Sequence, residues 1–175
     1  GCRAQHSGER GRQVTGQRTR WCQLWPYHTV EEADDVMPIL FKRLNPAARM
    51  PTYAHVGDAG ADLYAVNDIQ LFEAGQMLIE TGVAMAIPDG YVGLMYLRSS
   101  LSRRGLSLAN NVGVIDSGYR GEILVNISAT GPASIRAGER IAQLVVVAVK
   151  QWQFYEVDIL PTSDRGEAGF GSSGT

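Results

Sequence analysis

Short apolar segments separated by turn residues run along the chain from Pro38 onward, a pattern that is typical of an all-β domain. Met77–Ile87 and Tyr91–Leu97 are two of these segments. The turn Pro88-Asp89-Gly90 lies between them, and it combines a proline that fixes one φ with a glycine that tolerates positive φ. We therefore predict a hairpin from Met77 to Leu97.

Three further segments are rich in β-branched and aromatic residues and are predicted to be strands, namely Ile123–Ile127, Ile141–Val149 and Trp152–Ile159. No long amphipathic helix competes with them, and Leu101–Leu106 is expected to form at most one helical turn. The predicted fold class is therefore all-β.

The two ends of the chain differ in composition from this body. Residues 1–36 hold a Gln/Arg/Gly-rich stretch, an aromatic patch and an acidic run, and Met37 is a natural starting residue. The stretch suits either an arm that binds nucleic acid through stacking tryptophans or a disordered extension foreign to the domain, and we expect the second. From residue 162 the chain is too rich in glycine to pack on its own. We predict an extension over 1–36, a β-domain over 37–161 and a flexible arm over 162–175.

Composition and charge support one globular body. The 175 residues are 45% hydrophobic and 19% charged, which suits a packed core. The formal net charge of −2 gives no general attraction to nucleic acid or to an anionic membrane, although the first 28 residues carry five arginines and one glutamate. We expect no nucleic acid as a partner.

Cysteines and apolar runs narrow the function classes further. Cys2 and Cys22 both lie in the first segment, so no disulfide is expected in the main body, and no Cys/His set has zinc-ligand spacing. The longest apolar stretch, Ile141–Val149, is shorter than the roughly 18 to 20 residues that span a bilayer. The first 20 residues lack the apolar region of a signal peptide. We therefore expect a cytoplasmic protein with no membrane partner.

Five segments combine glycine with polar or charged residues, namely Asp58–Tyr64, Arg98–Ser100, Gly113–Glu122, Gly138–Gln143 and the tail from Thr162. Glycines let backbone N–H groups approach a ligand closely, and arginine and serine add donors, which together suit phosphate oxygens. The glycine-rich signatures of P-loop and Rossmann proteins are absent from the sequence. Each segment alone is an ordinary turn, so the argument depends on their combination.

In order and spacing, the five segments resemble the five motifs of the trimeric deoxyuridine triphosphatases (dUTPases), over a span from about Ile39 to Thr175. The matching stretches are Pro51–Ala65, Arg98–Leu101, Asn110–Glu122, Ala137–Gln143 and Arg165–Gly174. The resemblance implies a jelly-roll-like subunit in a homotrimer with three shared active sites, and hydrolysis of dUTP to dUMP and pyrophosphate. It also implies that the first, second and fourth motifs of one subunit meet the third motif of a second subunit and the tail of a third.

The resemblance further assigns roles in the third motif. Asp116 would be the general base that activates a water for attack at the α-phosphorus, which a carboxylate within hydrogen-bond reach can do. Tyr119 would pack under the deoxyribose and leave no room for a 2′-hydroxyl group. Asn110 would help to read the uracil edge together with backbone groups of Gly113, Val114 and Ile115.

The other motifs would serve the phosphates. The resemblance implies that Arg98, Ser99 and Ser100 bind phosphate oxygens and that Gln143 reaches the region of the α-phosphate. Asp62 is expected near a hydrated Mg²⁺, with water between them, because Mg²⁺ prefers substrate phosphate oxygens plus waters. In the tail, the expected substrate contacts come from Arg165, Phe170, Gly171, Ser172 and Ser173, with Arg165 on the γ-phosphate and Phe170 on the uracil.

The sequence departs from the family pattern at three points, and two alternative hypotheses stay open. Ser100 stands where the second motif usually has glycine, the stretch from Arg98 to Asn110 is one residue short, and Ala168 stands at a common glycine position. With Ser100, the stretch Arg98–Leu106 also resembles the related dCTP deaminases. Those enzymes use a glutamate at the position where this chain has Asn126. A non-enzymatic nucleotide-sensing or protein-binding module, using residues 1–36, is the third hypothesis.

Overall fold

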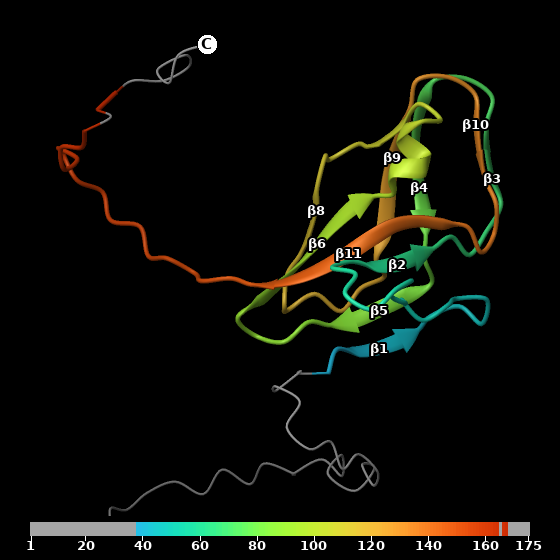
Figure 1. Cartoon of the computed structure of the whole chain (residues 1–175), viewed down its shortest axis with the longest axis horizontal. Helices are drawn as coiled ribbons and strands as arrows, with labels where there is room; N and C mark the ends of the chain where they lie inside the picture. Colours follow the sequence, from blue (N-terminus) through green and yellow to red (C-terminus); the bar gives the residue numbers. More distant parts are fainter. Residues whose placement is uncertain (1–37, 165, 168–175) are drawn as a thin grey trace, which may run out of the picture. The chain divides into compact units, whose positions relative to one another are not determined.

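The computed structural model describes residues 38–164, 166 and 167 (Figure 1). The predicted extension over 1–36 and the tail residues Arg165, Phe170, Gly171, Ser172 and Ser173 lie outside the described residues. The described chain forms eleven strands and one short helix: β1 Leu40–Arg43, β2 Ala61–Tyr64, β3 Ile69–Leu71, β4 Gly75–Glu80, β5 Val83–Ala86, β6 Tyr91–Leu97, α1 Ser99–Ser102, β7 Leu106–Leu108, β8 Gly113–Ile115, β9 Leu124–Ala129, β10 Ala133–Ile135 and β11 Arg140–Ala148.

Antiparallel pairing joins these strands into four sheets. The largest has the order β2-β11-β6-β8, and a second has the order β4-β9-β7. Two smaller sheets pair β1 with β5 and β10 with β3. Figure 1 shows the long β11 crossing the molecule between β2 and β6. The all-β class is confirmed, while the jelly-roll-like arrangement stays a prediction.

Alternating burial explains why these segments form strands. On β4, Met77 and Ile79 are buried while Leu78 between them is exposed. On β9, Val125 and Ile127 are fully buried, and they join Ile79 in one apolar core. Successive side chains of a strand point to opposite faces, so each strand contributes one face to this core. Each such side chain removed from water contributes roughly 1.5–3 kcal/mol to stability.

The predicted hairpin from Met77 to Leu97 is wrong, although its turn is confirmed. Tyr91 N donates to Pro88 O at 3.2 Å and Gly90 has φ +81, as the turn residues indicate. However, Thr81-Gly82 divides the first segment into β4 and β5, and β5 pairs with β1 while β6 pairs with β11 and β8. The turn therefore connects two sheets, because the strand edges on either side of it already have other partners.

The predicted strand Trp152–Ile159 is also wrong for the single chain. The structure gives this segment no strand partner, and all of its side chains are exposed, with Phe154 at 96%. The strands predicted at 123–127 and 141–149 are confirmed, since β9 and β11 cover them almost completely. The helical turn exists as α1, which begins two residues earlier than predicted.

Candidate active site

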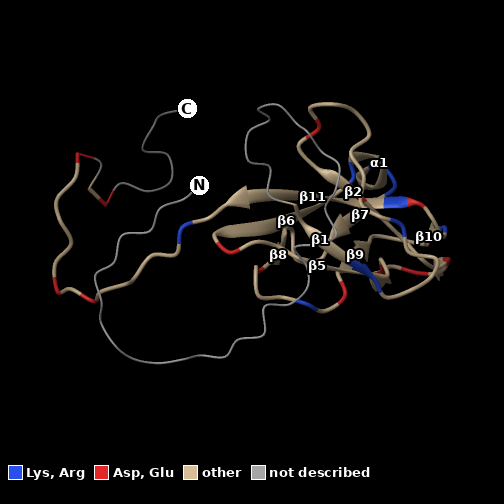
Figure 2. Cartoon of the chain, turned by 90° about the horizontal axis from the view of Figure 1, so that it is seen from below, with Lys and Arg blue, Asp and Glu red and all other residues tan. Residues whose placement is uncertain are grey.

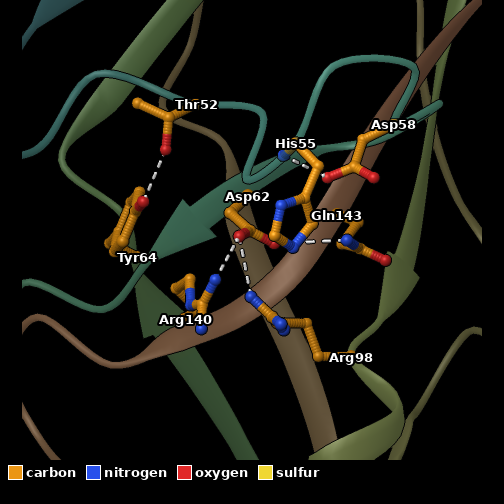
Figure 3. A network of polar contacts seen from close by, with 8 residues as sticks. All are labelled: Thr52, His55, Asp58, Asp62, Tyr64, Arg98, Arg140 and Gln143. Carbon is orange, nitrogen blue, oxygen red and sulfur yellow. Dashed lines mark hydrogen bonds and ion pairs between the residues drawn. The ribbon is translucent and has the colours of Figure 1, made fainter.

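Asp62 lies at the centre of a polar network on the largest sheet (Figure 3). Its carboxylate is almost fully buried, and Oδ2 lies 2.7 Å from Arg98 Nη1 and 3.1 Å from Arg140 Nη1. Gln143 Nε2 donates to the other oxygen, Oδ1, at 3.2 Å. The first, second and fourth predicted motifs therefore meet around one buried carboxylate.

Strand register explains this meeting. Gln143 on β11 is directly opposite Asp62 on β2 and Tyr96 on β6. Residues directly opposite each other on antiparallel strands share a face of the sheet. Arg98 follows β6 two residues after Tyr96, and Arg140 begins β11 opposite Tyr64, so both guanidinium groups can reach Asp62.

The electrostatics of the network favour an anion. One buried carboxylate with two arginine partners leaves a net charge of +1, and the Arg98 and Arg140 side chains remain 22% and 45% exposed. Figure 2 shows basic residues gathered near α1 and β2. The 2.7 Å contact of Arg98 Nη1 is an ion pair, but its direction is poor for a hydrogen bond, so this buried nitrogen lacks an aligned acceptor. Asp62 thus orients two cations that can bind phosphate oxygens.

A pocket of about 520 Å³ lies over this network and is lined by His55, Asp58, Gly60, Arg98, Arg140 and Gln143, among others. Gly60 has a steric role here, because an added Cβ would lie 3.0 Å from Gln143 Cβ and 3.4 Å from Val145 Cγ2. Ser99 and Ser100 are exposed at the start of α1 and do not line this pocket.

A second pocket, of about 220 Å³, brings together six of the residues predicted to bind or cleave substrate. They are Asn110, Gly113, Val114, Ile115, Asp116 and Tyr119. The mix of apolar wall, amide and carboxylate suits a small ligand with an apolar ring and a polar edge. The sequence prediction that these residues share a site is consistent with this geometry.

The segment that carries Asp116 is a loop between two sheets. Asp116 directly follows β8, which pairs with β6, whereas β9 pairs with β4 and β7. The backbone still turns at Asp116, because Tyr119 N donates to Asp116 O at 3.0 Å. The turn leaves the Asp116 side chain exposed at the pocket, where it can contact water and a ligand together.

The two pockets share no residue, and they lie on different faces of the largest sheet. Met95 lines the pocket of Asp116, while Tyr96, the next residue of β6, lines the pocket of Arg98. Consecutive strand residues point to opposite faces. One chain therefore does not bring Asp116 together with the Asp62 network.

Arg140 is a site residue that sequence reasoning did not single out. It lies inside the predicted fourth motif, but its importance depends on the ion pair with Asp62, which is 78 positions away in the chain. Only strand pairing shows that these two side chains meet. A charged residue at the first position of an apolar strand was the available signal.

No group of three or more His, Cys, Asp or Glu side chains capable of holding a metal ion occurs among the residues that the structure describes. In the same part of the chain, no helix is long and apolar enough to cross a membrane.

Comparison with known proteins gives consistent results. Residues 47–174 match the family model for dUTPase. The deoxyuridine 5′-triphosphate nucleotidohydrolase of Thermobifida fusca is 47% identical over 137 residues, which are 76% of this chain and 76% of that protein. The enzyme of the same name from Cutibacterium acnes is 50% identical over 129 residues, 71% of this chain and 85% of that protein.

Solved structures show the same likeness. A variant of the Staphylococcus bacteriophage 80alpha dUTPase with dUpNHpp superposes with a TM-score of 0.73 at 33% identity, covering 79% of this chain and 99% of that one. A variant of the dUTPase from phage phi11 of S. aureus, described with a structural Mg(II) ion, gives a TM-score of 0.65 at 29% identity, covering 70% and 98%.

Proposed function

This chain belongs to the dUTPase family, the dUTP diphosphatases, and we propose that it cleaves dUTP by attack of a water on the α-phosphorus, with Asp116 as the general base. The observation that carries this mechanism is the position of Asp116, an exposed carboxylate at the edge of the pocket that also contains Asn110 and Tyr119. A carboxylate that is open to water and next to a bound nucleotide can take the proton of the attacking water.

The pocket of Asp116 is the proposed uridine end of the site. The Asn110 amide offers one acceptor and two donors for the uracil edge, and backbone groups of Gly113, Val114 and Ile115 lie beside it. Tyr119 is the proposed platform for the deoxyribose. The solved phage 80alpha relative binds dUpNHpp, an analogue of the same nucleotide, which supports this choice of ligand.

The Asp62 network is the proposed triphosphate end. Arg98 and Arg140 already stand together because Asp62 holds both, so little reorganisation is needed when the phosphates arrive. Gln143 is the proposed contact near the α-phosphate, and Ser99 and Ser100 are proposed to add donors at the start of α1. In the tail, we propose that Arg165 binds the γ-phosphate and Phe170 stacks on the uracil, with Gly171, Ser172 and Ser173 closing beside them.

Mg²⁺ is proposed to arrive bound to the triphosphate. The Arg98 and Arg140 guanidinium groups would meet the phosphates and not the cation, whereas Asp62 Oδ1 accepts only from Gln143 within the described chain and keeps a lone pair for a water of the hydrated ion. No described cluster of side chains competes with phosphate oxygens as ligands. When bound, Mg²⁺ would neutralise phosphate charge.

A homotrimer with shared sites is part of the proposal. The pocket of Asp116 and the Asp62 network occupy different faces of one sheet, so a complete site requires more than one copy. The exposed apolar segment after β11 supports the same conclusion, because Trp152, Phe154 and Ile159 are 70%, 96% and 85% exposed. In the described chain β1 pairs only with β5, which leaves an edge where such a segment of a neighbour can add a strand.

Pyrophosphate release from four nucleotides tests the proposed function. Purified protein with Mg²⁺ is incubated in parallel with dUTP, dTTP, dCTP and UTP. We expect rapid release from dUTP alone. The compact uridine pocket should exclude the 5-methyl group of dTTP and the 4-amino group of dCTP, and Tyr119 should exclude the 2′-hydroxyl group of UTP. Conversion of dCTP to dUTP without pyrophosphate release would instead favour the deaminase, although Asn126 on β9 supplies an amide and not a carboxylate. Equal release from all four would contradict the proposed pocket.

A further inference from the structure

The Tyr119 side chain is held at both its hydroxyl group and its ring edge. Its hydroxyl donates to the backbone carbonyl oxygen of Glu122 at 2.8 Å. The edge of its ring lies against Gly121, where an added Cβ would be only 2.5 Å from Tyr119 Oη, 2.7 Å from Cζ and 3.0 Å from Cε2. Contacts this short do not occur between real atoms of this kind, so the observed position of Tyr119 requires glycine at 121.

Glu122 is in turn tied to a distant part of the chain. The backbone N–H of Gly82, 40 positions earlier, donates to Glu122 Oε1 at 2.7 Å. Gly82 is buried in the turn between β4 and β5 with φ +68, and an added Cβ there would lie 2.8 Å from Ala48 Cβ and 2.9 Å from Asn45 Cβ. The turn that holds the Glu122 carboxylate is therefore fixed by its own packing.

The same turn also holds the residue after Glu122. Thr81 Oγ1, itself buried, donates to Ile123 O at 2.6 Å, and Ile123 N donates to Val83 O at 2.9 Å. The carbonyl oxygen that receives the Tyr119 hydroxyl is thus placed by side-chain and backbone bonds to one rigid turn. At the opposite end of the loop, Tyr119 N donates to Asp116 O at 3.0 Å, and Arg120 Nη1 donates to the carbonyl oxygens of Ser117 and Tyr119 at 2.5 and 2.7 Å, so the bonds there stay within the loop itself.

We propose that Gly121 and Glu122 are positioning residues that set the height of the Tyr119 ring in the pocket, and so determine how strictly the enzyme refuses ribonucleotides. This inference rests on the proposed function, because it needs the nucleotide sugar to lie on Tyr119. The Tyr119 hydroxyl is occupied by Glu122 O, so the ring face is the part presented to a ligand. A ring that recedes from the pocket leaves space for the 2′-hydroxyl group that it otherwise excludes.

The test compares Glu122→Ala, Glu122→Gln and Gly121→Ala with the unaltered protein by kcat/KM for dUTP and UTP. We expect Glu122→Ala and Gly121→Ala to lower the dUTP/UTP ratio by roughly tenfold or more, with a larger change in KM than in kcat. Glu122→Gln should keep the ratio, since its amide oxygen can still accept from Gly82 N. The matched control is Glu80→Ala at the end of β4, which removes the 2.9 Å bond from Asn67 Nδ2 but has no bond to the loop of Tyr119.

An unchanged dUTP/UTP ratio of kcat/KM in a folded Glu122→Ala protein would overturn the proposal. A Glu122→Gln protein whose ratio falls as far as that of Glu122→Ala would overturn it too. Binding of the α,β-imido analogues of dUTP and UTP, measured by calorimetry, gives the same ratio without turnover. A protein that prefers the deoxy analogue but does not hydrolyse dUTP would contradict the proposed function alone. Equal binding of both analogues by the unaltered protein would leave no sugar selectivity for Gly121 and Glu122 to set, and would overturn their proposed role.

Discussion

Two aspartates of this chain occupy opposite environments. Asp62 is almost fully buried and is bound by two guanidinium groups and an amide, whereas Asp116 is exposed and its carboxylate has no partner among the described residues. A buried carboxylate that is fully engaged serves best to fix other groups, and its removal would leave two cations repelling each other. An exposed carboxylate remains free to accept a proton. Their surroundings therefore support different roles for the same side chain.

The role of Asp116 gives the prediction at this scale. Asp116→Asn should lower kcat for dUTP by about 10²- to 10⁴-fold while the Kd for a dUTP analogue changes little, because the amide keeps the shape but cannot act as a base. Pyrophosphate release measures the change in kcat, and calorimetry measures the change in Kd. Asp89→Asn is the control, since Asp89 is an exposed carboxylate near Asp116, and the two line a further pocket that does not contain Asn110 or Tyr119. Loss of binding in Asp116→Asn would instead mean that the residue holds the loop together.

At the scale of the elements, β6 depends on a glycine in its middle. Gly93 is buried where β6 lies between β11 and β8, and an added Cβ would lie 2.6 Å from Ile87 Cδ1, 3.0 Å from Leu144 Cδ1 and 3.3 Å from Ile115 Cβ. These neighbours belong to the core and have little space to move. The close approach of the three strands at this point therefore requires the absence of a side chain.

Gly93→Ala should lower the free energy of unfolding by about 1–3 kcal/mol, as overpacking of a core does. The midpoint of urea denaturation measures the change. Gly75→Ala at the start of β4 is the matched control, because a Cβ there meets nothing within 4 Å and should change stability by less than about 0.5 kcal/mol. Equal midpoints for the two variants would show that the core around Gly93 relaxes.

Strands whose residues alternate between apolar and polar, or are apolar throughout, could be predicted from the sequence, because the burial pattern of one strand is a local property. The partners of these strands could not be predicted in this way. The hairpin from Met77 to Leu97 failed because β5 and β6 pair with β1, β11 and β8, which lie elsewhere in the chain. Trp152–Ile159 has the composition of a strand, but composition does not supply the edge with which a strand must pair.

The candidate site shows the same limit. Glycines and polar residues that interrupt the apolar pattern marked the segment Gly113–Glu122, and the resemblance to the dUTPase motifs added Asn110 and the roles expected of Asp116 and Tyr119. It did not locate Arg140 as a partner of Asp62, or Glu122 as a partner of Gly82, since those pairs are 78 and 40 positions apart. Contacts of this kind depend on strand register, which a single sequence does not reveal.

At the scale of the whole molecule, the proposed sharing of sites can be tested by mixing two inactive proteins. Arg98→Gln removes a cation from the Asp62 network, and Asp116→Asn removes the base. Trimers reassembled from equal amounts of both should recover about a quarter of the unaltered activity, because each site then draws its two parts independently from two chains. The recovered activity is measured as pyrophosphate release after the two variants are denatured, mixed and refolded in one solution. The same proteins refolded separately are the control, and no recovery in the mixture would contradict shared sites.

Met95 and Tyr96 are neighbours on β6, yet they line different pockets. In the proposed trimer, this one strand therefore forms a wall of the uridine end of one site and of the triphosphate end of another. The backbone of β6 must therefore satisfy the geometry of two sites at once, and a substitution that shifts this strand would impair both ends together.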